Sequence, residues 1–220
     1  MARPKMVQSE LPFRSWGGPR PRSGRKPNGL RAGVPHGPRA PLAARYPVHV
    51  TARLRAGLPS LRRKESYRAL LRAFESGAER NGFRLTQYSV QSNHLHLIVE
   101  APNRETLSRG LQGLLIRVAR AVNRAWQRSG SIFSDRYHDR ILRSPKEVRN
   151  ALAYVLNNAK RHGIFEAGVD PFSSGRWFDG WRQAKPSESP PSILAKARTW
   201  LLTLGWRRWG LISLDTVPSR

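Results

Sequence analysis

Runs of alternating polar and apolar residues constrain the fold of this chain more than any other feature of its sequence. Val48–Leu54 alternates with a period of two residues, as a half-buried β-strand does. Residues 83–91 and 94–100 form two further strand-like runs, and the polar pair Ser92-Asn93 between them suits a short hairpin turn. The sequence therefore predicts a mainly antiparallel sheet with one apolar face.

Helical periodicity marks the segments between and after these strands, where apolar residues recur at spacings of three and four. Asn103 can cap the start of one such segment, and the pair Asn81-Gly82 can end another. Pro145 suits the first turn of a third. Helices are therefore expected over about 61–80, 105–128 and 145–162, with a short extended segment over 131–143. This order of elements predicts an α+β fold with helices packed on the sheet.

The charge of the chain indicates a polyanionic partner. Lys and Arg number 40 against 14 Asp and Glu, which gives a formal net charge of +26. Nucleic acid is favoured over a membrane, because no apolar run is long enough to span a bilayer. The chain has no cysteine, which excludes disulfides and thiolate metal sites. Without a visible secretory signal, we expect a cytoplasmic, nucleoid-associated protein.

The composition divides the chain into three parts. Residues 1–46 are rich in Arg and Pro and have few large apolar residues, which predicts a disordered basic arm. Residues 47–163 contain the predicted strands and the three main helices, and are expected to form a single catalytic domain. Residues 164–220, rich in Gly, Ser, Pro and Trp, are expected to form a C-terminal extension with a short helix.

Two patterns in the predicted domain can carry chemistry. In His94-Leu95-His96 both imidazoles project from one face of a strand, which supplies part of a metal site. Tyr154 and Asn158 are four residues apart on the third helix and can face one site, while Asn157 projects away from them. The alternatives are two surface histidines without a metal, and a tyrosine that only packs.

Arginines and aromatic residues supply the features of a nucleic-acid surface. Arginines along one face of the second helix can contact phosphates, and those of the arm can enter a minor groove. Trp126, Phe133 and Tyr137 can stack on unpaired bases. A solvated face, a basic tail and core packing are the respective alternatives. The expected DNA-binding residues are Arg22, Arg25, Arg117, Arg120, Arg124, Arg128 and Arg136.

Four ordered blocks of the sequence resemble a known family. The chain is similar to the REP-associated tyrosine transposases, which are single-tyrosine HUH transposases, over about residues 46–163. The resemblance implies a ferredoxin-like HUH domain. The blocks are Tyr88–Val99, Leu107–Gln112, Phe133–Tyr137 and Tyr154–Asn158.

The resemblance also implies a site and an activity. His94, His96 and Asn158 would hold a divalent ion, Mg²⁺ or Mn²⁺, and Tyr154 would be the nucleophile. The implied enzyme cleaves and rejoins single-stranded, hairpin-forming DNA through a 5′-phosphotyrosine intermediate, either as a monomer or as a homodimer. The alternative is a domesticated DNA- or RNA-binding protein that keeps this fold and does not cleave.

Overall fold

The computed structural model describes residues 37, 39–161, 163, 168–183 and 193–216. These residues fall in one compact unit, Val34–Arg220, whereas the other unit, Met1–Gly33, lies outside the described residues. The predicted DNA contacts of Arg22 and Arg25 and the predicted disorder of the arm up to residue 36 therefore lie outside them too, whereas residues 39–46 of the arm are described, with Leu42 buried and Arg39 paired with Asp139.

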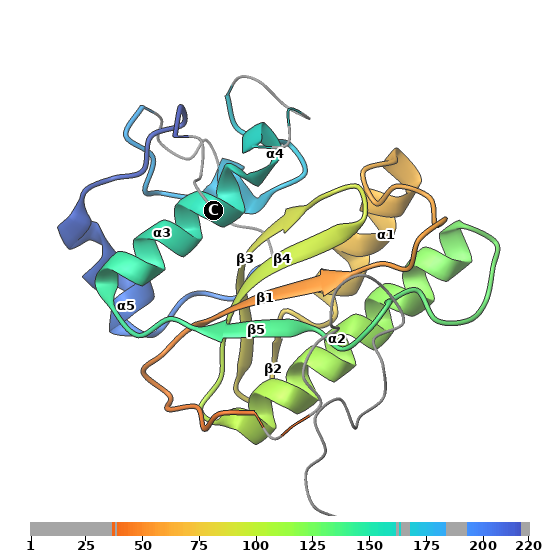
Figure 1. The fold of residues 1–220 in the computed structure, drawn as a ribbon, viewed down its shortest axis with the longest axis horizontal. Helices are drawn as coiled ribbons and strands as arrows, with labels where there is room; N and C mark the ends of the chain where they lie inside the picture. Colours follow the sequence, from red (N-terminus) through yellow and green to blue (C-terminus); the bar gives the residue numbers. More distant parts are fainter. Residues whose placement is uncertain (1–36, 38, 162, 164–167, 184–192, 217–220) are drawn as a thin grey trace, which may run out of the picture. The chain divides into compact units, whose positions relative to one another are not determined.

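A five-stranded antiparallel sheet forms the centre of the described unit, with strand order β2-β3-β4-β1-β5 (Figure 1). β4 is the middle strand, and β1 pairs with β4 on one side and with the edge strand β5 on the other. The prediction of a mainly antiparallel sheet is confirmed. The strands are β1 (Val48–Arg53), β2 (Glu79–Arg80), β3 (Phe83–Val90), β4 (His94–Glu100) and β5 (His138–Ile141).

Helices cover both faces of this sheet. The apolar side chains of β1 and β4, including Val50 and Leu97, share one buried cluster with residues of α1 and α2. A second cluster joins α3 to Ile98 on the opposite face. Figure 1 shows α3 on one side of the sheet and α2 on the other. The helices are α1 (Lys64–Glu75), α2 (Arg104–Ala125), α3 (Pro145–Leu156), α4 (Asn158–Arg161) and α5 (Trp200–Thr203), with the 3₁₀ turns η1 (Ser174–Trp177) and η2 (Gly205–Trp209).

The first helix is shorter than its periodicity predicts, and the reason is a hairpin. Asn81 and Gly82, expected to end the helix, form instead the turn between β2 and β3, with φ angles of 49° and 85°. Paired residues with positive φ match the right-handed twist of a two-residue hairpin, and Asn-Gly is the pair that adopts this turn most readily. The residues before the turn therefore extend a strand, and α1 ends at Glu75.

The second and third helices also end earlier than expected. Asn103 caps α2 as predicted, since its side chain accepts a hydrogen bond from the Thr106 N–H. α2 stops at Ala125, so Arg128 follows the helix instead of continuing its arginine face. Similarly, the segment 145–162 is not one continuous helix, because Asn157 leaves helical geometry between α3 and α4, with φ −101° and ψ 13°.

The C-terminal residues pack on the outer side of α3. Trp206 is fully buried and stacks on Phe178, with ring centroids 5.4 Å apart, in the cluster that contains the apolar side of α3. The buried Glu100 carboxylate at the end of β4 accepts the Thr199 N–H at 2.8 Å and pairs with Arg84. The short C-terminal helix, α5, is therefore tied to the sheet; the domain boundary at residue 164 stays a prediction.

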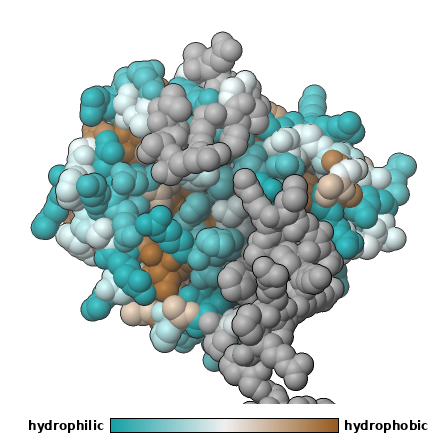
Figure 2. All heavy atoms as spheres, in the orientation of Figure 1, coloured by the Kyte–Doolittle hydropathy of each residue, from teal (hydrophilic) through white to brown (hydrophobic). Residues whose placement is uncertain are grey.

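The surface of this unit is mostly hydrophilic on the face drawn in Figure 2, with small hydrophobic patches. Within the described ranges, no helix combines the length and the hydropathy that crossing a bilayer requires.

Candidate active site

The face of the sheet opposite the main core carries a row of polar side chains. Thr51 of β1 lies directly opposite His96 of β4, and Arg53 lies opposite His94. Residues that pair across an antiparallel ladder project from the same face, so the side chains of these pairs gather beneath α3. Leu95 and Leu97 alternate with the histidines and are fully buried in the main core, as the sequence predicts.

The imidazoles of this face form a connected group. The Nε2 atoms of His94 and His96 are 3.0 Å apart. The Nδ1 atom of His96 lies 3.1 Å from Thr51 Oγ1 and 3.2 Å from His49 Nε2. The Nδ1 atom of His94 lies 2.8 Å from Asn93 Oδ1. Each imidazole of the H-x-H pair thus has its Nδ1 held by a neighbour, while the two Nε2 atoms converge.

Tyr154 of α3 joins this group from above the sheet. Its ring centroid lies 5.1 Å from that of His96 and 5.7 Å from that of His49, edge-on in both cases. α3 is fixed by its capping box, in which Ser144 and Glu147 bond reciprocally, and by its buried apolar side. The structure therefore brings together the predicted strand histidines and the predicted tyrosine.

Asn158 is placed differently from the prediction. It follows the break at Asn157 and begins α4, so it is not one turn further along the same helix as Tyr154. Its side chain is fully buried, and neither its Oδ1 nor its Nδ2 has a hydrogen-bond partner in the described structure. A buried amide without a partner costs about 1–3 kcal/mol, so this group needs a water, an ion or a ligand as its partner. The Asn157 amide, in contrast, donates to Ser213 O at 3.1 Å.

His49 is the residue of this group that the sequence reasoning missed. Burial, followed by the positive charges of His138 and Arg140, lowers its pKa from 6.5 to about 4. The imidazole is therefore neutral at pH 7, and its Nε2 can accept the Nδ1–H of His96. A signal was present, since His49 and Thr51 alternate with apolar residues in β1, but only the β1–β4 register brings them to His96.

The histidine pair fits a divalent ion. Bonds of about 2.0–2.1 Å at right or tetrahedral angles separate two ligand atoms by about 2.9–3.4 Å, which includes the observed Nε2 separation. An oxygen or nitrogen acceptor that holds Nδ1–H fixes the tautomer in which the lone pair of Nε2 is free to bind a metal ion. Among the described residues, no group of three or more His, Cys, Asp or Glu is arranged for a metal. The side-chain amide oxygen of Asn158, four residues after Tyr154, has no hydrogen-bond partner within the described structure and could serve as an uncharged third ligand.

The predicted arginine face lies elsewhere. Arg120 and Arg124 are exposed on α2, and Arg117 turns back to donate to Gly113 O at 2.8 Å. α2 covers the sheet face opposite to α3, so these arginines are separated from Tyr154 by the sheet (Figure 1). Arg128 lies beyond the helix, and Arg136 is exposed before β5.

The three aromatic candidates also lie away from the histidines. The Trp126 indole donates to Ser66 Oγ at 2.8 Å between α2 and α1, which is a packing role. Phe133 and Tyr137 line a groove of about 450 Å³ beside α2, and Arg39 lies 3.7 Å above the Tyr137 ring. Tyr137 therefore does not share a site with His96.

The family of the chain follows from its sequence. The family model described as "Transposase IS200 like" matches residues 46–158, just over half of the chain, and the chain belongs to this family. The match spans the strands β1 and β4 and ends at Asn158, so it contains the whole histidine–tyrosine group. No curated protein matches the chain.

One solved structure supports the same fold. A REP-associated tyrosine transposase bound to a REP hairpin is similar with a TM-score of 0.56 and 19% identity, covering 74% of this chain and 93% of that chain. A Deinococcus radiodurans R1 structure described as a transposase has a TM-score of 0.37 and 18% identity, over 49% and 84% of the two chains, and supports no argument here. The α+β HUH fold predicted from the resemblance is confirmed.

Proposed function

We propose that this transposase cleaves and rejoins single-stranded DNA through a covalent bond between Tyr154 and a 5′-phosphate. The observation that carries the proposal is the edge-on contact of the Tyr154 ring with His96, 5.1 Å between centroids, on a face where two imidazoles converge. A tyrosine hydroxyl beside a cation site can supply the nucleophile and the charge neutralisation that phosphodiester transfer needs.

Each residue of the site has a distinct task in this proposal. The Tyr154 oxygen attacks the phosphorus, the bond to the 3′ oxygen breaks, and the phenol loses its proton as the departing 3′ oxygen gains one. The 3′-hydroxyl later attacks the phosphotyrosine and reverses the exchange, so no nucleotide cofactor is consumed. His94, His96 and Asn158 would hold Mg²⁺ or Mn²⁺, which when bound neutralises charge on the non-bridging phosphate oxygens.

Hairpin-forming DNA is the substrate class that the comparisons favour. The similar transposase structure contains a REP hairpin, and the present chain has a net charge of +26. The arginines of α2 would then bind duplex or hairpin phosphates on the far side of the sheet. DNA binding by the α2 arginines would not depend on Tyr154. The same surface therefore also fits the second candidate, a DNA-binding protein that does not cleave.

The substitution Tyr154→Phe separates the two candidates. It removes one hydroxyl and keeps the ring that packs against His96 and His49, so DNA binding should change little while covalent capture stops. The measurement is denaturing gel analysis of protein–DNA adducts with labelled hairpin oligonucleotides, beside binding by fluorescence anisotropy. Wild-type protein that binds hairpins but never forms an adduct would favour the non-cleaving candidate, and an adduct formed by Tyr154→Phe would assign the nucleophile elsewhere.

A further inference from the structure

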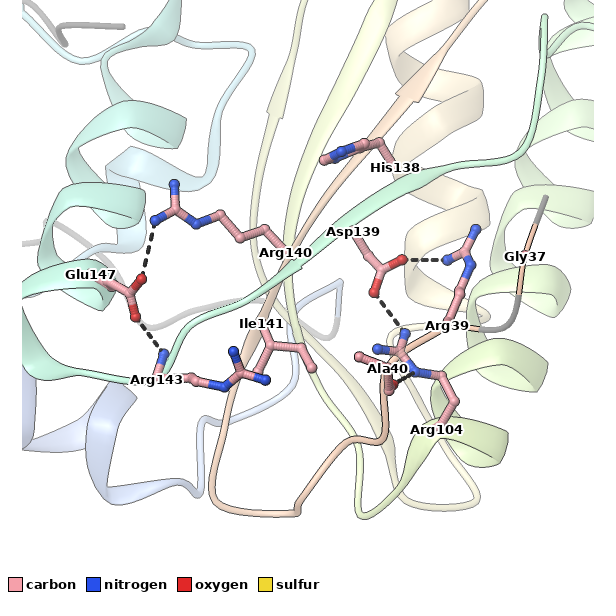
Figure 3. A pocket seen from close by; sticks show the side chains of 10 residues that line it. All are labelled: Gly37, Arg39, Ala40, Arg104, His138, Asp139, Arg140, Ile141, Arg143 and Glu147. Atoms are coloured by element: carbon pink, nitrogen blue, oxygen red, sulfur yellow. Dashed lines mark hydrogen bonds and ion pairs between the residues drawn. The ribbon is translucent and has the colours of Figure 1, made fainter. Parts of the chain in front are cut away.

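A pocket of about 420 Å³ borders the edge strand β5 (Figure 3). Its walls come from the segment before β1, from the start of α2, from β5 itself and from the first turn of α3. β5 pairs only with β1 in the described sheet, so its other side borders this pocket instead of another strand.

The half of the pocket nearest α2 is closed by a structural ion-pair group. Arg39 and Arg104 both bind the Asp139 carboxylate, each at 2.6 Å. The same guanidiniums donate to the backbone oxygens of Tyr137 and Ala40, each at 2.8 Å. Figure 3 shows both arginines converging on Asp139 from one side of β5. These two guanidiniums hold the segment before β1 in place, and their hydrogen bonds leave them little capacity to bind a ligand.

The half nearest α3 carries arginines that, within the described residues, are not held by a half-buried carboxylate and two or more hydrogen bonds, as Arg39 and Arg104 are. The Arg140 guanidinium makes one contact with Glu147, at 3.1 Å, and its side chain is 65% exposed. Glu147 is otherwise used by the backbone, since its carboxylate accepts the N–H groups of Arg143 and Ser144. The exposed Arg143 side chain has no ion pair within the described part of the chain. Arg140 and Arg143 therefore give this half of the pocket a net positive charge.

The sheet register connects this half of the pocket to the candidate active site. Arg140 lies opposite His49, and His138 lies opposite Thr51, so both project from the face that carries His96. Neighbouring strands are about 4.8 Å apart, which places this edge about 10 Å from β4. That distance is within reach of the phosphate next to a scissile phosphate at Tyr154.

We propose that Arg140 and Arg143, with His138, form a subsite for backbone phosphates of the single strand that flanks the scissile phosphate. The inference rests on the proposed function and adds the path of the substrate, over the edge at β5. The contacts are to non-bridging oxygens and carry no base preference. On binding, a phosphate replaces the Glu147 carboxylate as the acceptor of the Arg140 guanidinium, while Glu147 keeps its bonds to the start of α3.

The test combines substitution with single neutral phosphates. The double variant Arg140→Gln/Arg143→Gln and the wild type are given hairpin oligonucleotides with one methylphosphonate linkage, moved along the strand on both sides of the cleavage position. Wild type should lose about 10-fold or more in affinity when the neutral linkage lies at the subsite. The double variant should bind the unmodified oligonucleotide more weakly than wild type by a similar factor. A neutral linkage at the subsite should then cause no further loss of affinity in the double variant.

Matched controls make the result specific. The control variant Arg80→Gln/Arg109→Gln removes the same amount of charge from exposed residues outside the pocket. It should still lose affinity when the neutral linkage lies at the subsite, as wild type does. Arg143→Gln alone removes a side chain without an ion-pair partner, so it should fold normally and show part of the effect. A double variant that keeps the wild-type pattern of interference overturns the subsite.

Binding and cleavage are scored separately, because the two proposals can fail independently. If the wild type forms no adduct while the interference pattern still disappears in the double variant, the proposed cleavage fails and the subsite stands. If adducts form with Tyr154 but the interference pattern is the same in both proteins, the subsite fails and the proposed cleavage stands.

Discussion

On β1 and β4, neighbouring residues point to opposite faces of the sheet, and the two faces differ in chemistry. One face consists of fully buried apolar residues such as Val50 and Leu97, packed under α1 and α2. The other carries His49, Thr51 and His96 under α3. A strand that is rigid because one face is packed can hold imidazoles in fixed positions on its other face. Substitutions one residue apart should therefore separate stability from chemistry.

The largest expected effect is the loss of cleavage in His96→Ala. Removing this imidazole takes away one proposed metal ligand and the contact with Tyr154, and the lost charge stabilisation should be on the order of 4 kcal/mol, or about 1000-fold in rate. Single-turnover cleavage of a labelled hairpin measures it. Retention of the wild-type rate at low Mg²⁺ would remove His96 from the site.

The neighbouring substitution Leu97→Ala should have the opposite profile. Truncating a fully buried leucine costs about 2–5 kcal/mol of unfolding free energy, because it removes apolar contacts and leaves a cavity. Urea denaturation measures this loss. Below the unfolding transition, cleavage should remain within a few-fold of wild type. A thousandfold loss of cleavage in the folded variant would contradict the separation of the two faces.

The pH dependence of stability tests His49. Its folded pKa of about 4 lies below the ordinary 6.5, so the unfolded chain binds the proton more tightly. Stability should fall as the pH drops from about 6.5 to about 4, by up to about 3 kcal/mol, and this contribution is fully present above pH 6.5. Urea denaturation of wild type and His49→Gln at pH 7 and pH 4.5 measures the difference. Equal slopes in the two proteins would show that His49 is not buried in its neutral form.

The smallest expected effect concerns the orphaned amide. Asn158→Leu keeps the approximate volume and removes two buried polar atoms that lack partners, so the metal-free protein should gain about 1 kcal/mol of stability. Affinity for Mn²⁺, measured by titration calorimetry, should fall in the same variant. A destabilised variant with unchanged Mn²⁺ affinity would show that Asn158 is a packing residue.

The features that the sequence predicts well are those set by local periodicity. The H-x-H face of β4 and the Asn103 cap of α2 depend on residues only a few positions apart, and both are confirmed. The end of α3 coincides with a distant contact, since the side chain of its C-cap residue Asn157 bonds to Ser213 O, 56 residues away. No window of neighbouring residues contains that information.

The missing part of the site has a similar cause. The significance of His49 arises from strand pairing, which brings it to His96 of β4, 47 residues away. The periodic pattern of α2 continues in the sequence to Arg128, but the helix has ended before Gln127, which adopts a φ of 51°. Periodicity predicts which side of an element a residue occupies, but not where the element ends or what lies opposite it.

The proposed nucleophile and the proposed metal ligands are supported by separate parts of the chain. His94 and His96 belong to the sheet, whereas the helix that carries Tyr154 is held from outside by the C-terminal residues 210–214. Arg149 of α3 donates to Gly210 O at 2.9 Å, and Lys160 of the adjoining α4 donates to Leu214 O. Changes in this tail can therefore shift the tyrosine relative to the histidines without altering either residue. Related chains with different tails could in this way acquire different reaction geometries while keeping the same catalytic side chains.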